Sequence, residues 1–129
     1  MSTANIIVPK ERNGREHVRA IDVELLCQEL ESHRRVVIVD VRTRGEFHGP
    51  RGHITGAISI PIHHLLARWR ELEGHRHDTL VLVSERGVTS RLAGLELEFA
   101  GFEDVRTLEG GMLKWWEHGY PVTVDHARR

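Results

Sequence analysis

The chain has 129 residues, 40% hydrophobic and 29% charged, which is enough for one domain with a real core and too little for two. Its 18 Lys and Arg residues balance 19 Asp and Glu residues, so nothing points to nucleic acid or an anionic membrane as a partner. No apolar run approaches the roughly 20 residues that cross a bilayer, and the first 19 residues lack the apolar stretch of a secretory signal.

Cys27 is the only cysteine of the chain. A single cysteine excludes an intrachain disulfide, a cysteine zinc cluster and a Cys-x-x-Cys redox pair, and it is typical of a protein from a reducing cytoplasm. Of the ten histidines, His75 and His77 stand close together, but no third ligand follows at metal-site spacing. We therefore interpret the histidines as surface residues and expect neither a metal nor a cofactor.

The N-terminal half predicts an edge strand, a helix and a buried strand. A tail or edge strand covers residues 1–15, with its apolar part at 6–8. Asp22 is a residue type that caps helices, and apolar residues follow it at helical spacing: Val23, Leu26, Cys27 and Leu30. The β-branched run at 36–40 predicts a strand buried on both faces, and a short strand follows at 57–60.

The second half continues the alternation of helices and strands. A helix of modest quality at 63–72 carries Leu65, Leu66 and Trp69, and a second fully buried strand covers 79–83. The next helix carries Leu92, Leu95 and Phe99, with Ala93 and Leu97 beside them. A last strand at 104–107 and a helix at 112–118 complete the pattern. This order is typical of an α/β domain with a largely parallel sheet; we place it at residues 16–123, followed by a tail at 124–129.

Two loops follow the buried strands, at the sheet edge where ligands of parallel α/β domains bind. In the loop at 84–90, Gly87 permits a sharp turn and Arg86 adds positive charge, so successive amides there could attract an anion. The alternative is a purely structural turn with Thr89 or Ser90 as the N-cap.

The other loop begins at Asp40 and Arg42. These residues face the same rim as the loop at 84–90 if the two strands are parallel. Together with Glu46 they could equally form a helix cap and a surface ion pair, which contributes little to stability.

Several short motifs, taken together, resemble the rhodanese domain between residues 22 and 122. They are Asp40-Val41-Arg42, Glu46-Phe47, Gly52-His53-Ile54-x-Gly56-Ala57, Ile60-Pro61, and Gly110-Gly111 with Trp115. The resemblance implies a single domain with a five-stranded, mostly parallel sheet flanked by helices, and an active site in the loop after the strand at 79–83. It leaves His53, Gly56, Gly111 and Trp115 as residues of the fold.

In catalytic rhodaneses this loop begins with a cysteine, whereas here its six residues are Ser84, Glu85, Arg86, Gly87, Val88 and Thr89. The ending Gly-Val-Thr resembles thiosulfate and mercaptopyruvate sulfurtransferases. The related phosphatases have a loop one residue longer that ends in Arg, so they are the poorer analogy. Sulfur transfer needs a thiolate, and a serine is a weak nucleophile that cannot form an S–S bond.

The sequence therefore predicts a rhodanese-type sulfurtransferase site whose nucleophile is replaced by Ser84, inactive as written and able to bind anions. The expected partners are a small anionic sulfur donor and a thiol acceptor, either a small molecule or a protein. We expect Arg86 to attract the donor, the amides of residues 85–90 to cradle it, and Asp40 and Arg42 to lie at the rim, where Arg42 helps to shape the site.

Two other interpretations stay open. A natural, non-catalytic rhodanese-like module would use the loop for binding or regulation, and the sequence does not decide between that and a nucleophile replaced deliberately. A hydrolase with Ser84 as its nucleophile is the third, although the chain lacks the Gly-x-Ser-x-Gly elbow and a recognisable triad.

Overall fold

The computed structural model describes residues 18–125, so the predicted edge strand at 6–8 lies outside the described residues. The strands are β1 (Arg19–Ile21), β2 (Val36–Asp40), β3 (His53–Ile54), β4 (Ile58–Ser59), β5 (Thr79–Val83), β6 (Asp104–Leu108) and β7 (Val122–Thr123). The helices are α1 (Val23–Glu31), α2 (Arg44–Phe47), α3 (Leu65–Arg68), α4 (Thr89–Phe99) and α5 (Gly111–Glu117), with the 3₁₀ segments η2 (Ile62–His64) and η3 (Trp69–His75).

Five parallel strands form the central sheet in the order β1-β6-β5-β2-β4, which confirms the predicted α/β class. The buried strands predicted at 36–40 and 79–83 have the predicted bounds. A second, two-stranded sheet pairs β3 with β7 in antiparallel register.

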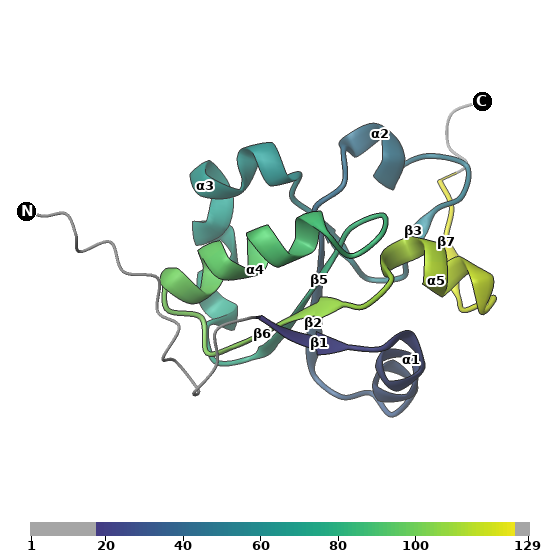
Figure 1. Ribbon diagram of the computed structural model, residues 1–129, viewed down its shortest axis with the longest axis horizontal. Coiled ribbons are helices and arrows are strands. Elements are labelled where there is room, and N and C mark those ends of the chain that lie inside the picture. The colour runs from purple at the N-terminus through teal and green to yellow at the C-terminus, as the bar shows by residue number, and fades with distance from the viewer. Residues whose placement is uncertain (1–17, 126–129) are drawn as a thin grey trace, which may run out of the picture.

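Helices cover both faces of the sheet (Figure 1): α3 and α4 lie on one side and α1 on the other. The side chains of β5 point alternately to the two faces of the sheet, which explains this arrangement: Leu80 and Leu82 belong to the core beneath α3 and α4. Val81 and Val83 belong to the core shared with α1 and α5. A strand with apolar side chains on both faces requires cover on both.

The first helix is built as its sequence predicts. The Asp22 carboxylate accepts a hydrogen bond from the amide of Leu25 at 2.8 Å and caps α1. Val23, Leu26 and Cys27 are buried, and Leu30 is half-buried on the same side.

The buried face of α4 differs from the prediction. Leu92 and Phe99 are exposed, and the side that meets the sheet consists of small residues and one leucine: Ser90, Ala93, Gly94 and Leu97. A Cβ at Gly94 would lie 2.9 Å from the Val18 side chain, so the helix packs too closely for large side chains there. The buried face of α4 is the one where its backbone comes closest to the sheet. The spacing of the large apolar residues Leu92 and Phe99 therefore predicts the wrong face.

The region predicted as one helix at 63–72 is broken into η2, α3 and η3. Leu65 and Leu72 are buried, whereas Leu66 is exposed on the outer side, contrary to the predicted stripe. Within residues 18–125, no helix is both long and apolar enough to cross a membrane.

Candidate functional site

The two predicted loops meet at the carboxyl edge of the sheet. Asp40, the last residue of β2, is in register with Val83, the last residue of β5, and the amide of Val41 donates to the carbonyl of Val83 at 2.9 Å. The loops that follow these strands therefore start side by side, as parallel strands require.

Ser84 forms the floor of its loop. Its side-chain oxygen accepts a hydrogen bond from the amide of Gly87 at 3.0 Å and donates one to the Ser90 hydroxyl at 3.2 Å. Among the described residues, neither a histidine nor a carboxylate is hydrogen-bonded to this hydroxyl, so the base contact that activates a serine nucleophile is not formed. This geometry argues against a serine hydrolase.

Ser90 and Thr89 do not cap α4, contrary to one predicted alternative. The N-cap is Val88, which has no side-chain capping bond, and Thr89 is the first helical residue. The Ser90 hydroxyl instead bonds Ser84 and the Thr107 hydroxyl of β6. Ser90 is therefore part of the floor of the loop.

Glycines and α5 hold the loop in shape. Gly87 has a φ of +91°, and a Cβ there would lie 3.1 Å from both the Gly110 amide and the Leu108 carbonyl. A Cβ at Gly111 would lie 2.4 Å from the Ser84 carbonyl. Gly111, which was predicted to be a residue of the fold, thus lies directly against the Ser84 loop.

Several loop amides are left as unused donors. Across residues 18–125, no protein acceptor takes the amides of Glu85, Arg86 or Val88. Arg86 is exposed and Glu85 is half-buried. Clustered free amides beside a cationic side chain are suited to bind an anion.

The Asp40–Arg42 pair is buried, which corrects the interpretation as a helix cap with a surface ion pair. Arg42 donates to Asp40 through Nε at 3.0 Å and through Nη2 at 2.8 Å, and the two side chains are 3% and 1% exposed. Arg42 Nη2 also reaches the Gly52 carbonyl at 3.1 Å. The cap of α2 is Thr43, in a capping box with Glu46.

A cavity of about 220 Å³ opens beside Ser84. Its polar lining includes Arg42, Glu46, His63, Ser84, Glu85 and Thr89. Asp40 neutralises Arg42, so Glu46 and Glu85 make this cavity more acidic than the loop sequence suggests. His63 was not among the predicted site residues; it reaches the cavity from η2, where the amide of Ile62 donates to the carbonyl of Val41.

A neighbouring cavity of about 380 Å³ shares Arg42, Glu46 and Glu85 and ends at Trp116. The guanidinium of Arg51 lies 3.7 Å from the centre of the Trp116 ring, and Trp116 Nε1 donates to the Arg51 carbonyl at 2.9 Å. Neither residue was predicted at the site, because residues so far apart in sequence give no local pattern.

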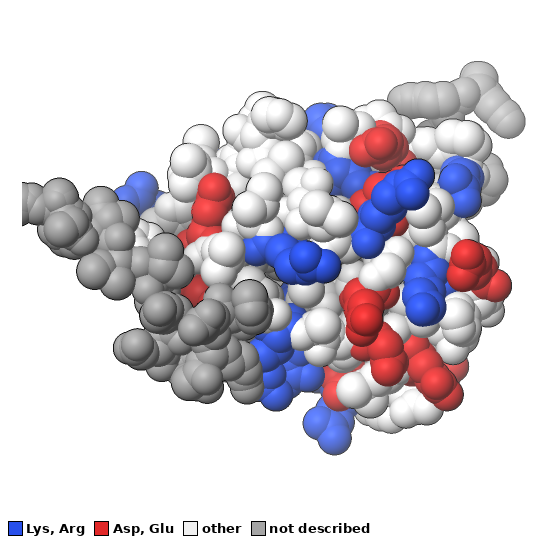
Figure 2. Space-filling model, viewed as in Figure 1, with Lys and Arg blue, Asp and Glu red and all other residues white. Residues whose placement is uncertain are grey.

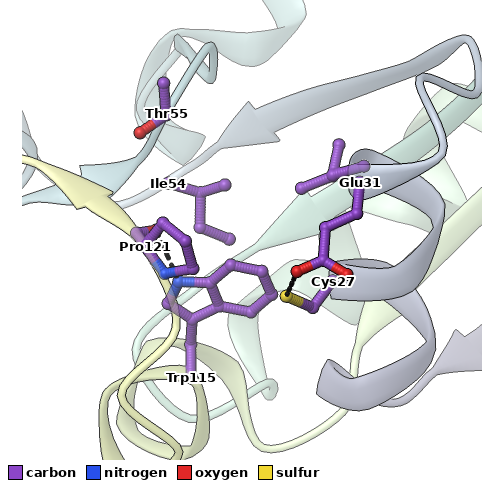
Figure 3. Close-up of a pocket in the computed structure, with 7 residues that line it drawn as sticks. Cys27, Glu31, Ile54, Thr55, Trp115 and Pro121 are labelled. Carbon is purple, nitrogen blue, oxygen red and sulfur yellow. Dashed lines mark hydrogen bonds between the residues drawn. The ribbon is translucent and has the colours of Figure 1, made fainter.

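Cys27 belongs to a different part of the molecule (Figure 3). It lines a cavity of about 330 Å³ with Trp115 and Ile54, and its thiol donates to the Glu31 carboxylate at 3.8 Å. Burial raises the pKa of the Cys27 thiol, and the charge and hydrogen bond of Glu31 raise it further. A protonated, 8% exposed thiol is a poor nucleophile.

Charge on the viewed face is mixed: Figure 2 shows Lys and Arg interspersed with Asp and Glu. His75 pairs with Asp78 at 2.9 Å and His77 with Glu103 at 2.9 Å. In the described part of the chain, no three His, Cys, Asp or Glu side chains are grouped to hold a metal ion.

The five-stranded parallel sheet, with helices on both faces and a glycine-containing loop after β5, defines an α/β domain whose family was identified by comparison with known proteins. Residues 22–118 match the rhodanese-like domain, and the chain belongs to this family. It is 33% identical over 110 residues to a protein of Allochromatium vinosum named sulfurtransferase, covering 85% of this chain and 99% of that protein.

Two further relatives agree. A thiosulfate sulfurtransferase of Shewanella oneidensis is 34% identical over 75% of this chain and 91% of its own. The crystal structure of a rhodanese-related protein from Thermoplasma volcanium superposes with a TM-score of 0.73 at 30% identity, over 83% of this chain and 99% of that one. Some other curated relatives are longer, and the chain spans 37–51% of their length.

Proposed function

We propose that the chain carries a sulfurtransferase site for a small anionic sulfur donor in which Ser84 occupies the place of the nucleophilic cysteine. With serine at position 84, the site binds the anionic donor but does not transfer its sulfur. The observation that carries this proposal is the loop itself: Ser84 lies at its floor, and free amides of Glu85, Arg86 and Val88 surround it. Relatives named sulfurtransferase support the same reaction class.

With a thiolate at position 84, the reaction balances in two steps. The thiolate attacks the sulfane sulfur of thiosulfate, an S–S bond forms, and the original S–S bond breaks with its electron pair leaving as sulfite. Cyanide or a thiolate acceptor then takes the terminal sulfur, giving thiocyanate or a persulfide and restoring the thiolate at 84. A serine hydroxyl supports neither step, because oxygen cannot accept the sulfur as an S–S bond.

The test is the Ser84→Cys variant in a Cys27→Ala background, so that the introduced thiol is the only one. Incubation with thiosulfate is expected to add the mass of one sulfur atom, and cyanide is expected to remove it as thiocyanate. The unchanged chain is the matched control, since it presents only the buried Cys27. A folded double variant that gains no sulfur would overturn the proposal.

A non-catalytic binding module is the second candidate, because the Ser84 hydroxyl is already satisfied by Gly87 and Ser90. Titration of the unchanged chain with thiosulfate, followed by amide NMR, is expected to shift the signals of Glu85, Arg86 and Val88. Binding without sulfur uptake by the double variant would favour the module. The sulfurtransferase proposal also includes a thiol acceptor, either a small molecule or a protein, and a reducing cytoplasm, where acceptor thiols stay reduced.

A further inference from the structure

Three buried hydroxyls form a chain from the floor of the loop into the sheet. Ser84 donates to Ser90, and Ser90 is hydrogen-bonded to Thr107. Their exposed fractions are 4%, 0% and 3%. Buried hydroxyls in a row are costly unless each is bonded, so the arrangement fixes all three side chains relative to one another.

Each hydroxyl comes from a different element, and each element is held independently. Thr107 lies in β6, in register with Leu82 of β5 on one side and Ala20 of β1 on the other. Ser90 lies in the first turn of α4, on the side that packs against the sheet. Because the loop, α4 and β6 are each held in place, the hydroxyl oxygen of Ser90 lies between those of Ser84 and Thr107.

The direction of the hydrogen bonds depends on what stands at position 84. A hydroxyl has one proton and two acceptor sites. With a protonated side chain at 84, the proton points toward Ser90. With an anion at 84, Ser90 turns its own proton toward that anion and accepts a hydrogen bond from Thr107, so the direction of the bond between positions 84 and 90 reverses. A hydrogen bond to a charged acceptor is about twice as strong as a neutral one, and the Thr107 bond polarises Ser90 further.

We propose that Ser90 is a catalytic residue and Thr107 a positioning residue of the sulfur-transfer site: when a cysteine stands at position 84, Ser90 donates a hydrogen bond to its sulfur anion, and Thr107 acts through Ser90. This rests on the proposed function, which requires that anion. Other charged groups also face position 84. Arg42, Glu46, His63 and Glu85 line the same cavity, Arg86 projects from the loop, and α5 contributes only backbone amides to the loop carbonyls. The test must therefore vary the hydroxyls alone.

The background is the Ser84→Cys, Cys27→Ala chain, and the measurement is the pKa of its single thiol, from the pH dependence of iodoacetamide alkylation. Adding Thr107→Val is expected to raise that pKa by about half a unit to one unit, the usual scale for one lost hydrogen bond. Alkylation below the pKa then slows about 3- to 10-fold. Ser90→Ala is expected to have the larger effect, and Thr107→Ser is expected to restore the original value.

Thr79→Val is the matched control. The Thr79 hydroxyl is also bonded in the sheet, to Asp104 at 2.8 Å, but at the opposite end of β5. It is expected to lower stability and leave the thiol pKa unchanged. An unchanged pKa in folded Thr107→Val and Ser90→Ala would overturn the proposal, as would an equal shift in Thr79→Val. If Thr107→Val does not fold, Ser90→Ala decides alone.

The two proposals fail separately. A thiol pKa that responds to Ser90 and Thr107, in a protein that takes no sulfur from thiosulfate, would remove the proposed function and leave the hydroxyl chain. Sulfur uptake from thiosulfate, with a thiol pKa that is the same in the Ser90 and Thr107 variants, would support the proposed function and overturn the role of the hydroxyl chain.

Discussion

The tripeptide Asp-Val-Arg occurs twice, once at each end of the sheet, and the two copies differ in their surroundings. Asp40 and Arg42 follow β2 at the carboxyl edge beside the candidate site, whereas Asp104 and Arg106 begin β6 at the amino edge. Both arginines donate to their aspartates through Nε and Nη2, at 3.0 and 2.8 Å in the first pair and at 3.0 and 3.0 Å in the second.

The difference lies in solvent and in additional partners. The first pair is almost fully buried, and Arg42 also donates to the Gly52 carbonyl. The second pair is 21% and 26% exposed, and Asp104 also accepts from Thr79. A buried pair must be complete to be tolerated, while a partly solvated pair can lose a member to water. The same tripeptide is therefore required for the folded structure at Asp40–Arg42, whereas at Asp104–Arg106 it contributes only modestly to stability.

The largest expected effect is that of Asp40→Asn. It leaves the Arg42 charge buried without its counter-ion, which costs about 3–5 kcal/mol of unfolding free energy. Urea unfolding monitored by tryptophan fluorescence measures it. A loss no larger than that of Asp104→Asn would show that burial does not separate the two pairs.

Replacement of arginine by lysine sharpens the contrast. Arg42→Lys loses the two-pronged geometry and the bond to the Gly52 carbonyl, and we expect a loss of about 1–3 kcal/mol because buried acceptors are left unsatisfied. At the other end of the sheet, Arg106→Lys is expected to cost below about 1 kcal/mol. Comparable losses in the two variants, from the same unfolding experiment, would contradict this explanation.

Asp104→Asn has a smaller effect that depends on pH. Burial opposes ionisation of Asp104, but hydrogen bonds from Arg106 and Thr79 outweigh it and lower the pKa of the carboxyl. A lowered pKa means that the stabilisation is complete above the pKa of an unfolded aspartate, about 4, and is lost as the pH falls through the lower folded value. The difference in unfolding free energy between the chain and the variant, about 1 kcal/mol or less at pH 7, should therefore shrink below about pH 4. A difference that stays constant down to pH 3 would exclude ionisation of Asp104 as its source.

Salt gives the smallest expected effect. In 1 M NaCl, where the Debye length is about 3 Å, the contribution of the partly exposed Asp104–Arg106 pair is screened and that of the buried Asp40–Arg42 pair is not. The stability loss caused by Asp104→Asn should fall by a few tenths of a kcal/mol, while the loss caused by Asp40→Asn stays the same. Equal salt sensitivity of the two losses would argue that both pairs are solvated.

The sequence predicted β2 and β5 because a strand buried on both faces requires an uninterrupted apolar run. It predicted the Ser84 loop because ligand loops follow such strands. It did not predict which face of α4 is buried. Gly94 lets the helix backbone come close to the sheet, and the spacing of apolar residues does not indicate such a contact. The contact between Ser90 and Thr107 joins residues 17 positions apart, and polar residues in a buried floor leave no local pattern.

The start of α5 has a consequence for how the site meets a ligand. The amides of Met112 and Leu113 donate to the carbonyls of Ser84 and Glu85 at 2.9 and 3.0 Å. The first amides of a helix usually need outside acceptors, and here the loop provides them. The loop is thereby preorganised: a ligand meets donors already in position and does not have to order them on binding. These two hydrogen bonds also couple the loop to α5, so a displacement of α5 would remove the acceptor contacts that hold the Ser84 loop in shape.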